Sequence, residues 1–328
     1  MSLTAAGAPT PESGRPPRPA LAPHAPAPGR VRRLLGPFYV TGVFWYRLPY
    51  NAVRYGVLSV YTFPAWVALC STIFSIVLLN IRDAIASNLE AVLGPCGFWE
   101  RQRRIYRTIE AFSWCYGARY FQIVHPGSFQ VEVEGAEHIP TDPSRGVIFV
   151  TAHLGQWELS SHLASHGLER AIHVVREEEM DPEAQRFIEE LVSGMSAQGV
   201  TTHFASDDPR LGIALAEALR RGEIVALQGD RPRVHGRTHT ATLFGRPMPL
   251  PIGPQSLARA TGAALLPVFS FREGRYSYRV VVRPPIPVAR TRDREADVAD
   301  AVQRLAGEIE WAIRRAPHQW FCLRRLWS

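Results

Sequence analysis

Residues 146–158 read GVIFVTAHLGQWE, and the fold class follows from how this stretch divides. Residues 147–150 are β-branched or aromatic throughout, which predicts a short buried strand. His153 comes just after that strand, Gly155 supplies a turn, and residues 159–167 are helix-like. A strand, a turn and a helix in this order place His153 at the carboxyl edge of a sheet, where open α/β folds usually hold their sites.

The spacing of His153 and Glu158 limits how the two side chains can meet. On one continuous helix, residues five apart lie about 140° apart around the axis and do not face each other. They meet only if His153 lies in the turn before the helix and Glu158 in its first turns. The carboxylate can then accept a hydrogen bond from one ring nitrogen and fix the tautomer, which makes the other nitrogen a general base for a hydroxyl.

The composition excludes several classes of chemistry. The chain has 328 residues, is 46% hydrophobic and carries a net charge of +7, and all its basic residues apart from histidine are arginine. Without lysine there is no P-loop lysine and no Schiff base with pyridoxal phosphate. The sequence also has no Gly-x-Ser-x-Gly elbow. The four cysteines form no Cys-x-x-Cys pair, so we expect reduced, structural thiols.

The N-terminal third differs from the rest in composition. Residues 1–33 are rich in proline, alanine and glycine and predict a disordered basic tail. Residues 34–122 predict a helical, membrane-associated region, because residues 55–81 carry no charge and exceed the roughly 20 residues of a transmembrane helix. Pro64 and several hydroxyl side chains interrupt the run, so a helical hairpin or interfacial helix pair is an open alternative. An ordinary buried helix is another.

Residues 123–328 alternate between strand-like and helix-like segments. We therefore predict an α/β domain with a mostly parallel central sheet covered by helices, behind an N-terminal apolar helical membrane anchor. The predicted strands are 129–133, 146–151, 171–175, 200–204, 224–228, 264–271 and 276–282. The predicted helices are 157–166, 182–196, 210–221, 253–261 and 295–315.

Further polar residues are predicted at the same sheet edge as His153. Asp230 and Arg231 directly follow the strand 224–228. Residues 243–247 read as a turn-rich loop that leads to a helix starting at Gly253. A purely structural interpretation is also open, in which these residues only cap and connect the helices and strands of an α/β domain.

Together these pieces resemble the lipid A biosynthesis (lauroyl/myristoyl) acyltransferase family, a branch of the lysophospholipid acyltransferase superfamily. The resemblance runs from about Phe44 to the C-terminus. Gln156 stands where the family often has asparagine. Glu158, without a later Glu-Gly-Thr-Arg-like motif, favours the lipid A-like branch over the glycerolipid branch. The matching pieces are HLGQWE at 153–158, Arg176, Asp230-Arg231, FGRP at 244–247, the helix start at 253–254 and PHQW at 317–320.

The resemblance implies an acyltransferase in which His153 deprotonates an acceptor hydroxyl and Glu158 holds the histidine. The hydroxyl attacks the thioester of an acyl carrier protein or coenzyme A, with no cofactor and no covalent acyl-enzyme. The implied acceptor is a lipid or glycolipid, such as a lipid A precursor, at the cytoplasmic face of the bacterial inner membrane. We expect an anionic membrane as a partner and no nucleic acid. The candidate substrate contacts are Arg176, Asp230, Arg231, Gly245 and Arg246.

Two alternatives come from other classes of function. Glu158, His162 and His166 recur every fourth residue, and such a stripe on one helix can bind zinc, with His235 and His239 as further ligands. A metal-binding hydrolase is therefore one alternative. The other is a non-catalytic, lipid-binding homologue, for which replacing His153 would change nothing.

Overall fold

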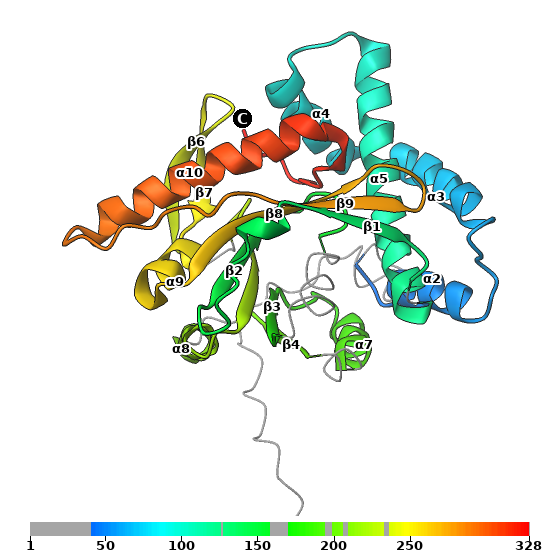
Figure 1. The fold of residues 1–328 in the computed structure, drawn as a ribbon. Helices are drawn as coiled ribbons and strands as arrows, with labels where there is room; N and C mark the ends of the chain where they lie inside the picture. The colour runs from blue at the N-terminus through cyan, green and yellow to red at the C-terminus, as the bar shows by residue number, and fades with distance from the viewer. Residues whose placement is uncertain are drawn as a thin grey trace, which may run out of the picture.

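A seven-stranded sheet in the order β1-β9-β8-β2-β5-β3-β4 runs through the molecule (Figure 1). The computed structural model describes residues 41–125, 127–157, 170–193, 199–205, 209–232 and 236–327. All neighbouring strands pair in parallel except β8 and β9, so the predicted, mostly parallel sheet is confirmed. The strands are β1 (Gln130–Glu134), β2 (Val147–Thr151), β3 (Ile172–Arg176), β4 (Val200–Phe204), β5 (Ile224–Gln228), β8 (Ala264–Arg272) and β9 (Ser277–Val282).

The central strand β2 shows why this sheet is covered on both faces. All five of its residues are buried, and the first four alternate between two separate core clusters. Ile148 and Val150 belong to one cluster, and Val147 and Phe149 belong to the other. Buried on both sides in this way, a parallel strand reads as a continuous apolar run, which is the pattern seen in the sequence.

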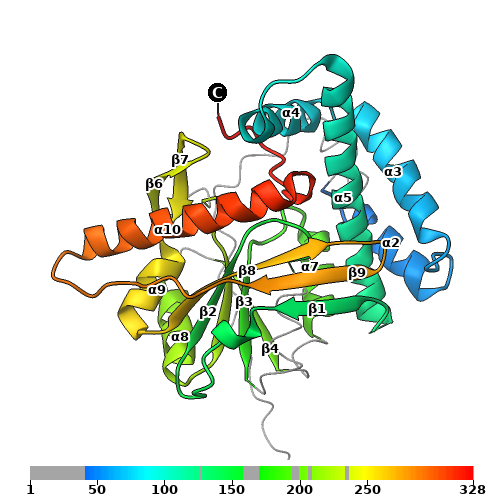
Figure 2. The same cartoon turned by 45° about the horizontal axis from the view of Figure 1, so that its top comes forward.

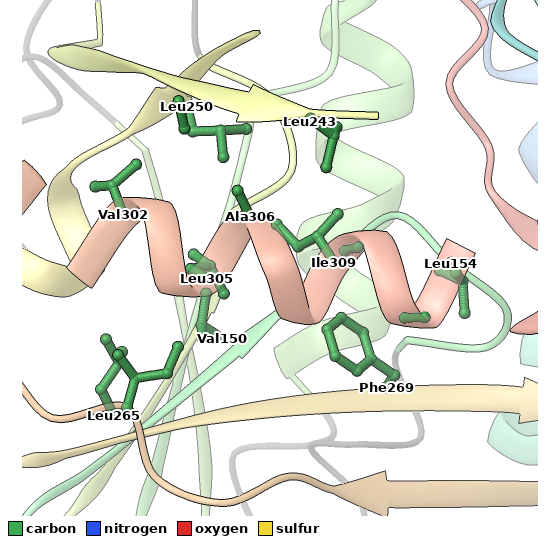
Figure 3. Packing of buried hydrophobic residues seen from close by; sticks show 14 of the residues in the cluster. Val150, Leu154, Leu243, Leu250, Leu265, Phe269, Val302, Leu305, Ala306 and Ile309 are labelled. Carbon is green, nitrogen blue, oxygen red and sulfur yellow. The ribbon is translucent and has the colours of Figure 1, made fainter. Parts of the chain in front are cut away.

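Helix α10 (Arg294–Arg315) covers one face of the sheet (Figure 3). Leu305 and Ile309 of this helix belong to the same core cluster as Val150 and Phe269 of the sheet. The helices α8 (Pro209–Arg220) and α9 (Gly253–Thr261) lie on the same side and contact each other. These helices agree with the predicted ones to within a residue at each end.

A two-stranded hairpin packs on the outer side of α10 and was not predicted. The strands β6 (Thr238–Leu243) and β7 (Arg246–Pro251) are joined by a turn in which Phe244 and Gly245 both have positive φ angles, 52° and 71°. Leu243 and Leu250 point from the hairpin towards α10 (Figure 3). The sequence predicts the turn at 244–245 within a loop of residues 243–247, but it predicts neither of the two strands.

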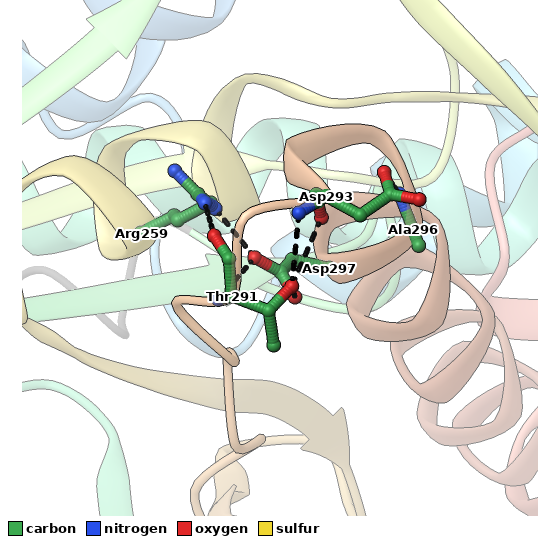
Figure 4. Close-up of polar contacts among 5 residues, drawn as sticks. All are labelled: Arg259, Thr291, Asp293, Ala296 and Asp297. Atoms are coloured by element: carbon green, nitrogen blue, oxygen red, sulfur yellow. Dashed lines mark hydrogen bonds and ion pairs between the residues drawn. The ribbon is translucent and has the colours of Figure 1, made fainter.

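The first turn of α10 is tied to α9 by a carboxylate network (Figure 4). Asp293 caps the helix by accepting a hydrogen bond from the backbone N–H of Ala296 at 3.0 Å. The buried Asp297 accepts one from Arg259 Nε at 2.8 Å and others from the backbone and hydroxyl of Thr291. Because Arg259 comes from α9, this network fixes the position of α9 against α10.

Four helices precede the sheet in the described part of the chain, and three of them, α2, α3 and α5, pack on its other face (Figure 2). Val53, Phe63 and Trp114 of these helices share a core cluster with strand residues such as Phe149 and Val280. Helices α3 and α5 lie so close that a Cβ on Gly117 would be 2.5 Å from the Phe63 ring. The helices are α2 (Phe44–Arg54), α3 (Phe63–Val77), α4 (Leu79–Leu93) and α5 (Phe98–Val124), and α7 (Pro182–Ser193) contacts α2.

The predicted membrane segment forms two helices. Residues 55–81 contain α3 and the first residues of α4, and the two helices are bent by 94° relative to each other. Within the described part of the chain, no single helix is long and apolar enough to cross a membrane, and only this bent pair passes that test of length and composition. The predicted tail, residues 1–33, lies outside the described residues.

Candidate active site

His153 and Asp230 meet at the carboxyl edge of the sheet because their strands are paired in register. Thr151, the last residue of β2, is the register partner of Gln228, the last residue of β5. Each functional side chain follows two residues later. His153 Nδ1 lies 2.7 Å from Asp230 Oδ1, so the imidazole donates its Nδ1 proton to the carboxylate. This hydrogen bond fixes the tautomer and leaves Nε2 as the basic nitrogen.

Asp230 is buried, with 1% of its surface exposed. Burial on its own would raise the pKa of this carboxyl group. The charge and hydrogen bond of His153, together with the charge of Arg231, outweigh burial and hold the pKa well below its usual range. The second oxygen, Oδ2, accepts a hydrogen bond from Trp320 Nε1 at 3.3 Å. The carboxylate is therefore ionised and held from two sides.

The C-terminal segment fastens the loop that carries His153. The backbone N–H of Phe321 donates to the carbonyl of His153 at 2.7 Å, and the N–H of Gly155 donates to the carbonyl of Gln319 at 2.9 Å. The side-chain amide of Gln319 in turn bonds both the N–H and the carbonyl of Arg272 on β8. The loop therefore sits between β8 and the segment that follows α10.

Gly155 is required where this loop crosses β8. Its φ angle is +56°, and a Cβ at this position would lie 1.9 Å from the carbonyl oxygen of Ser270. A side chain at this position would therefore clash with the backbone of β8. It would also require a positive φ angle, which L-residues rarely adopt.

A pocket of about 850 Å³ opens beside His153. Apolar side chains from α8, α9 and the ends of β3 and β5 line most of it, including Leu211, Leu215 and Leu257. Five arginines also line it: Arg176, Arg220, Arg231, Arg294 and Arg324. The pocket is thus suited to a ligand with a long apolar part and an anionic or strongly polar part.

The predicted site residues fall into four groups. Arg176 and Arg231 line the pocket with His153, whereas Asp230 lies behind the histidine ring; their substrate contacts stay a prediction. Gly245 and Arg246 lie at the hairpin turn, and the guanidinium of Arg246 is 6.0 Å from the centre of the Trp327 ring. They are not among the described residues that line the pocket. Glu158 lies outside the described residues.

Of the five residues of the predicted metal site, only His239 lies within the described part of the chain. Glu158, His162, His166 and His235 lie outside the described residues, and His239 is exposed on β6. The part of the chain that the structure describes holds no group of three or more histidine, cysteine or acidic side chains arranged to bind a metal.

Trp320 and Gln319 contact the candidate site, but they were not singled out from the sequence. They belong to the PHQW run at 317–320, whose residues were noted only as part of the resemblance. Pro317–Gln319 forms the short helix η4, which directs Trp320 towards Asp230. The contact joins residues 90 positions apart, so no local sequence pattern predicts it.

Comparison with known proteins decides the family. The family model described as bacterial lipid A biosynthesis acyltransferase matches residues 60–328, which is most of the chain. This chain belongs to that family. The match contains the sheet, His153, Asp230 and the C-terminal segment.

Members with curated names give a second comparison. The phosphatidylinositol mannoside acyltransferases of Mycobacterium tuberculosis strains H37Rv and CDC 1551 are 29% identical over 202 residues, which is 60% of this chain and 59% of each relative. The protein of that name from Mycolicibacterium smegmatis is 27% identical over 203 residues, 60% of this chain and 62% of the relative. The matched region thus spans less than two-thirds of each relative.

Proposed function

We propose that this chain is an acyltransferase that moves a fatty acyl group from a thioester to a hydroxyl of a glycolipid or other lipid. One observation carries the proposal: a histidine whose Nδ1 is held by a buried carboxylate lines an apolar pocket studded with arginines. Family membership supports the reaction type. The relatives' name supports a glycolipid acceptor of the phosphatidylinositol mannoside kind, and the family's description supports a lipid A precursor.

His153 acts as the general base in this proposal. The acceptor O–H gives its proton to Nε2 while its oxygen attacks the thioester carbonyl carbon. The new C–O bond forms, the C–S bond breaks, and the imidazolium returns the proton to the leaving thiolate. Asp230 stabilises the imidazolium because it is ionised and bonded to Nδ1. The role of Glu158 in the same step stays a prediction.

The acyl group passes directly from donor to acceptor. Burial, followed by the nearby charge of Asp230, raises the pKa of the Cys322 thiol to about 11, so this neighbouring cysteine is protonated and a poor nucleophile. The apolar part of the pocket accommodates the acyl chain. The arginines, Arg176 and Arg231 among them, bind phosphates of the donor or acceptor through paired N–H groups. The donor is an acyl carrier protein or acyl-coenzyme A, and both are anionic.

The proposed location is the cytoplasmic face of the bacterial inner membrane. Helix α3 supports membrane contact, because Leu69 and Ile73 lie one turn apart on it and are both exposed. A surface of this kind binds the interface between lipid headgroups and acyl chains.

His153→Ala is the variant that tests this function. We expect the rate of acyl transfer from a radiolabelled acyl thioester to a glycolipid acceptor to fall by about 10²–10⁴-fold, the usual contribution of a general base. The variant should still fold, but its melting temperature should fall, because the buried Asp230 carboxylate loses the hydrogen bond and the charge of His153. A variant that keeps more than half of the wild-type rate would contradict the assignment and favour a non-catalytic, lipid-binding homologue.

The absence of an acyl-enzyme needs its own experiment. Wild-type protein is incubated with the labelled thioester alone, denatured and counted. We expect no protein-bound label. Stoichiometric label that moves to the acceptor when acceptor is added would show a covalent intermediate. Loss of transfer on chelation, restored by zinc, would instead support the metal site of Glu158, His162 and His166.

A further inference from the structure

The first turn of α5 exposes two adjacent aromatic side chains. Phe98 is 67% exposed and Trp99 is 82% exposed, and their rings form a T-shaped pair with centroids 5.2 Å apart. Single exposed apolar residues are common on protein surfaces, but neighbouring ones that form a patch usually mark a binding surface.

Other exposed apolar side chains lie at the same corner of the molecule. Val77 ends α3 and Leu79 begins α4, and both are exposed. Arg82 Nη2 donates to Gln102 Oε1 at 2.6 Å, which ties the first turn of α4 to the second turn of α5. In both views the junction of α3 and α4 lies beside the upper part of α5, whose first turn is at the top (Figures 1 and 2). We call Val77, Leu79, Phe98 and Trp99 the corner surface.

The charge around the corner surface is positive. Residues 98–107 read FWERQRRIYR, with four arginines and one glutamate. Arg103 and Arg104 both pair with that glutamate, Glu100, and Arg101 lies 3.8 Å from Glu90 of α4, so four arginines face two carboxylates and a positive excess remains. Exposed aromatic side chains beside arginines are the composition of protein surfaces that lie in the headgroup region of anionic bilayers.

We propose that the corner surface docks onto an anionic lipid bilayer. Phe98 and Trp99 insert at the level of the headgroups, and the arginines of the first turns of α5 face the lipid phosphates. This contact is separate from the exposed side of α3 around Leu69 and Ile73. It rests on the membrane location of the proposed function but not on acyl transfer, so vesicle binding and transfer activity test the two separately.

Vesicle flotation with the purified full-length protein tests the proposal. The vesicles are phosphatidylcholine alone, or phosphatidylcholine with about a third of phosphatidylglycerol, whose headgroup is anionic. For Phe98→Ala/Trp99→Ala we expect the partition coefficient on anionic vesicles to fall about tenfold or more, because two large apolar surfaces are lost. Arg101→Gln/Arg103→Gln should lower binding to anionic vesicles and leave binding to neutral ones unchanged.

The matched control is Ile123→Ala/Val133→Ala. It also removes two exposed apolar side chains, one from the last turn of α5 and one from β1. Its binding should equal that of the wild type, and all variants should keep the wild-type melting temperature. Wild-type binding by Phe98→Ala/Trp99→Ala would overturn the proposal and favour a protein partner. An equal loss in the control, or equal wild-type binding to both vesicle types, would overturn it too.

Discussion

Asp230 is the residue on which the candidate site depends most, because its two oxygens meet His153 and Trp320. Asp230→Asn keeps the shape but places an amide where the carboxylate accepts the Nδ1 proton, so the other tautomer becomes available. We expect kcat to fall by about 10²–10⁴-fold, with KM little changed, since Asp230 lies behind the ring. Steady-state rates with a saturating thioester measure this.

Glu158→Gln is the comparison for that variant. If Asp230 orients the imidazole, Asp230→Asn should cost more than Glu158→Gln. The reverse order would assign the orienting role to Glu158 and contradict the interpretation of the His153–Asp230 hydrogen bond. Trp320→Phe, which loses only the Nε1 donor to Asp230, should cost less than either.

Gly155 offers a prediction about stability. Gly155→Ala should lower the free energy of unfolding by more than the 1–2 kcal/mol or so that a positive φ angle costs an L-residue, because its Cβ also meets the carbonyl oxygen of Ser270. Gly245→Ala is the control, since Gly245 has φ +71° and nothing within 4 Å of the added Cβ. Urea unfolding measures both. Equal losses would show that the contact with Ser270 relaxes.

At the scale of elements, β3 and β4 are joined by a hydrogen-bonded histidine pair. His203 Nε2 lies 2.9 Å from His173 Nδ1, and His173 Nε2 lies 2.7 Å from Glu223 Oε2. Because Glu223 accepts from His173, the remaining ring nitrogen of His173 accepts from His203. His203 can donate this Nε2–H bond whether it is neutral or protonated, so it is burial that favours its neutral form.

This pair predicts how stability depends on pH. Burial, and then the charge of His173, lower the pKa of His203 from its ordinary value. A histidine with a depressed folded-state pKa contributes stability that is complete above the unfolded-state pKa of about 6.5. That contribution is lost as the pH falls from there through the folded-state pKa. Acidification through this window should therefore lower the free energy of unfolding.

His203→Gln should flatten that part of the pH dependence. The exposed His239→Gln is the control and should leave the curve of the wild type unchanged. Chemical unfolding at a series of pH values below neutrality gives both curves. A His203→Gln curve that falls as steeply as the wild type would contradict the role of the pair.

At the scale of the whole molecule, the helical region and the sheet share one core. Phe63 and Val67 of α3 are buried with Trp114 and with strand residues such as Leu266. Deleting residues 1–81 would therefore open this cluster, and we expect aggregation rather than a released, folded enzyme. Membrane contact is better tested by changing exposed side chains.

Leu69→Gln/Ile73→Gln alters only the exposed side of α3. We expect a shift of the protein from the membrane pellet towards the soluble fraction, with an unchanged melting temperature, because both side chains already face outward. Fractionation of cells at high salt measures the shift. Quantitative recovery in the pellet would place the membrane contact elsewhere, the corner surface included.

The sequence by itself determined the seven strands of the sheet. Buried strands such as β2 and β5 are short apolar runs bounded by turn residues. This pattern is local, so it can be recognised in the sequence without knowing which strands pair. It also placed Asp230 and Arg231 at the same sheet edge as His153, because successive parallel strands end on the same side. The hairpin β6–β7 was not predicted from the sequence. Its second strand contains Pro247, Pro249 and Pro251, and proline within a run argues against a strand. These prolines occupy alternate positions that need no ladder hydrogen bond, which only the pairing with β6 reveals.

Only the tertiary structure decided which carboxylate meets Nδ1 of His153. The sequence favoured Glu158, five residues away, because a sequence shows only which residues are close along the chain. Asp230 is 77 residues from His153, and Trp320 is a further 90 residues on. Their meeting depends on β5 pairing next to β2 in register, and on the segment after α10 folding back across the loop. Strand order and chain return are set by how the whole core packs, so no local pattern encodes them.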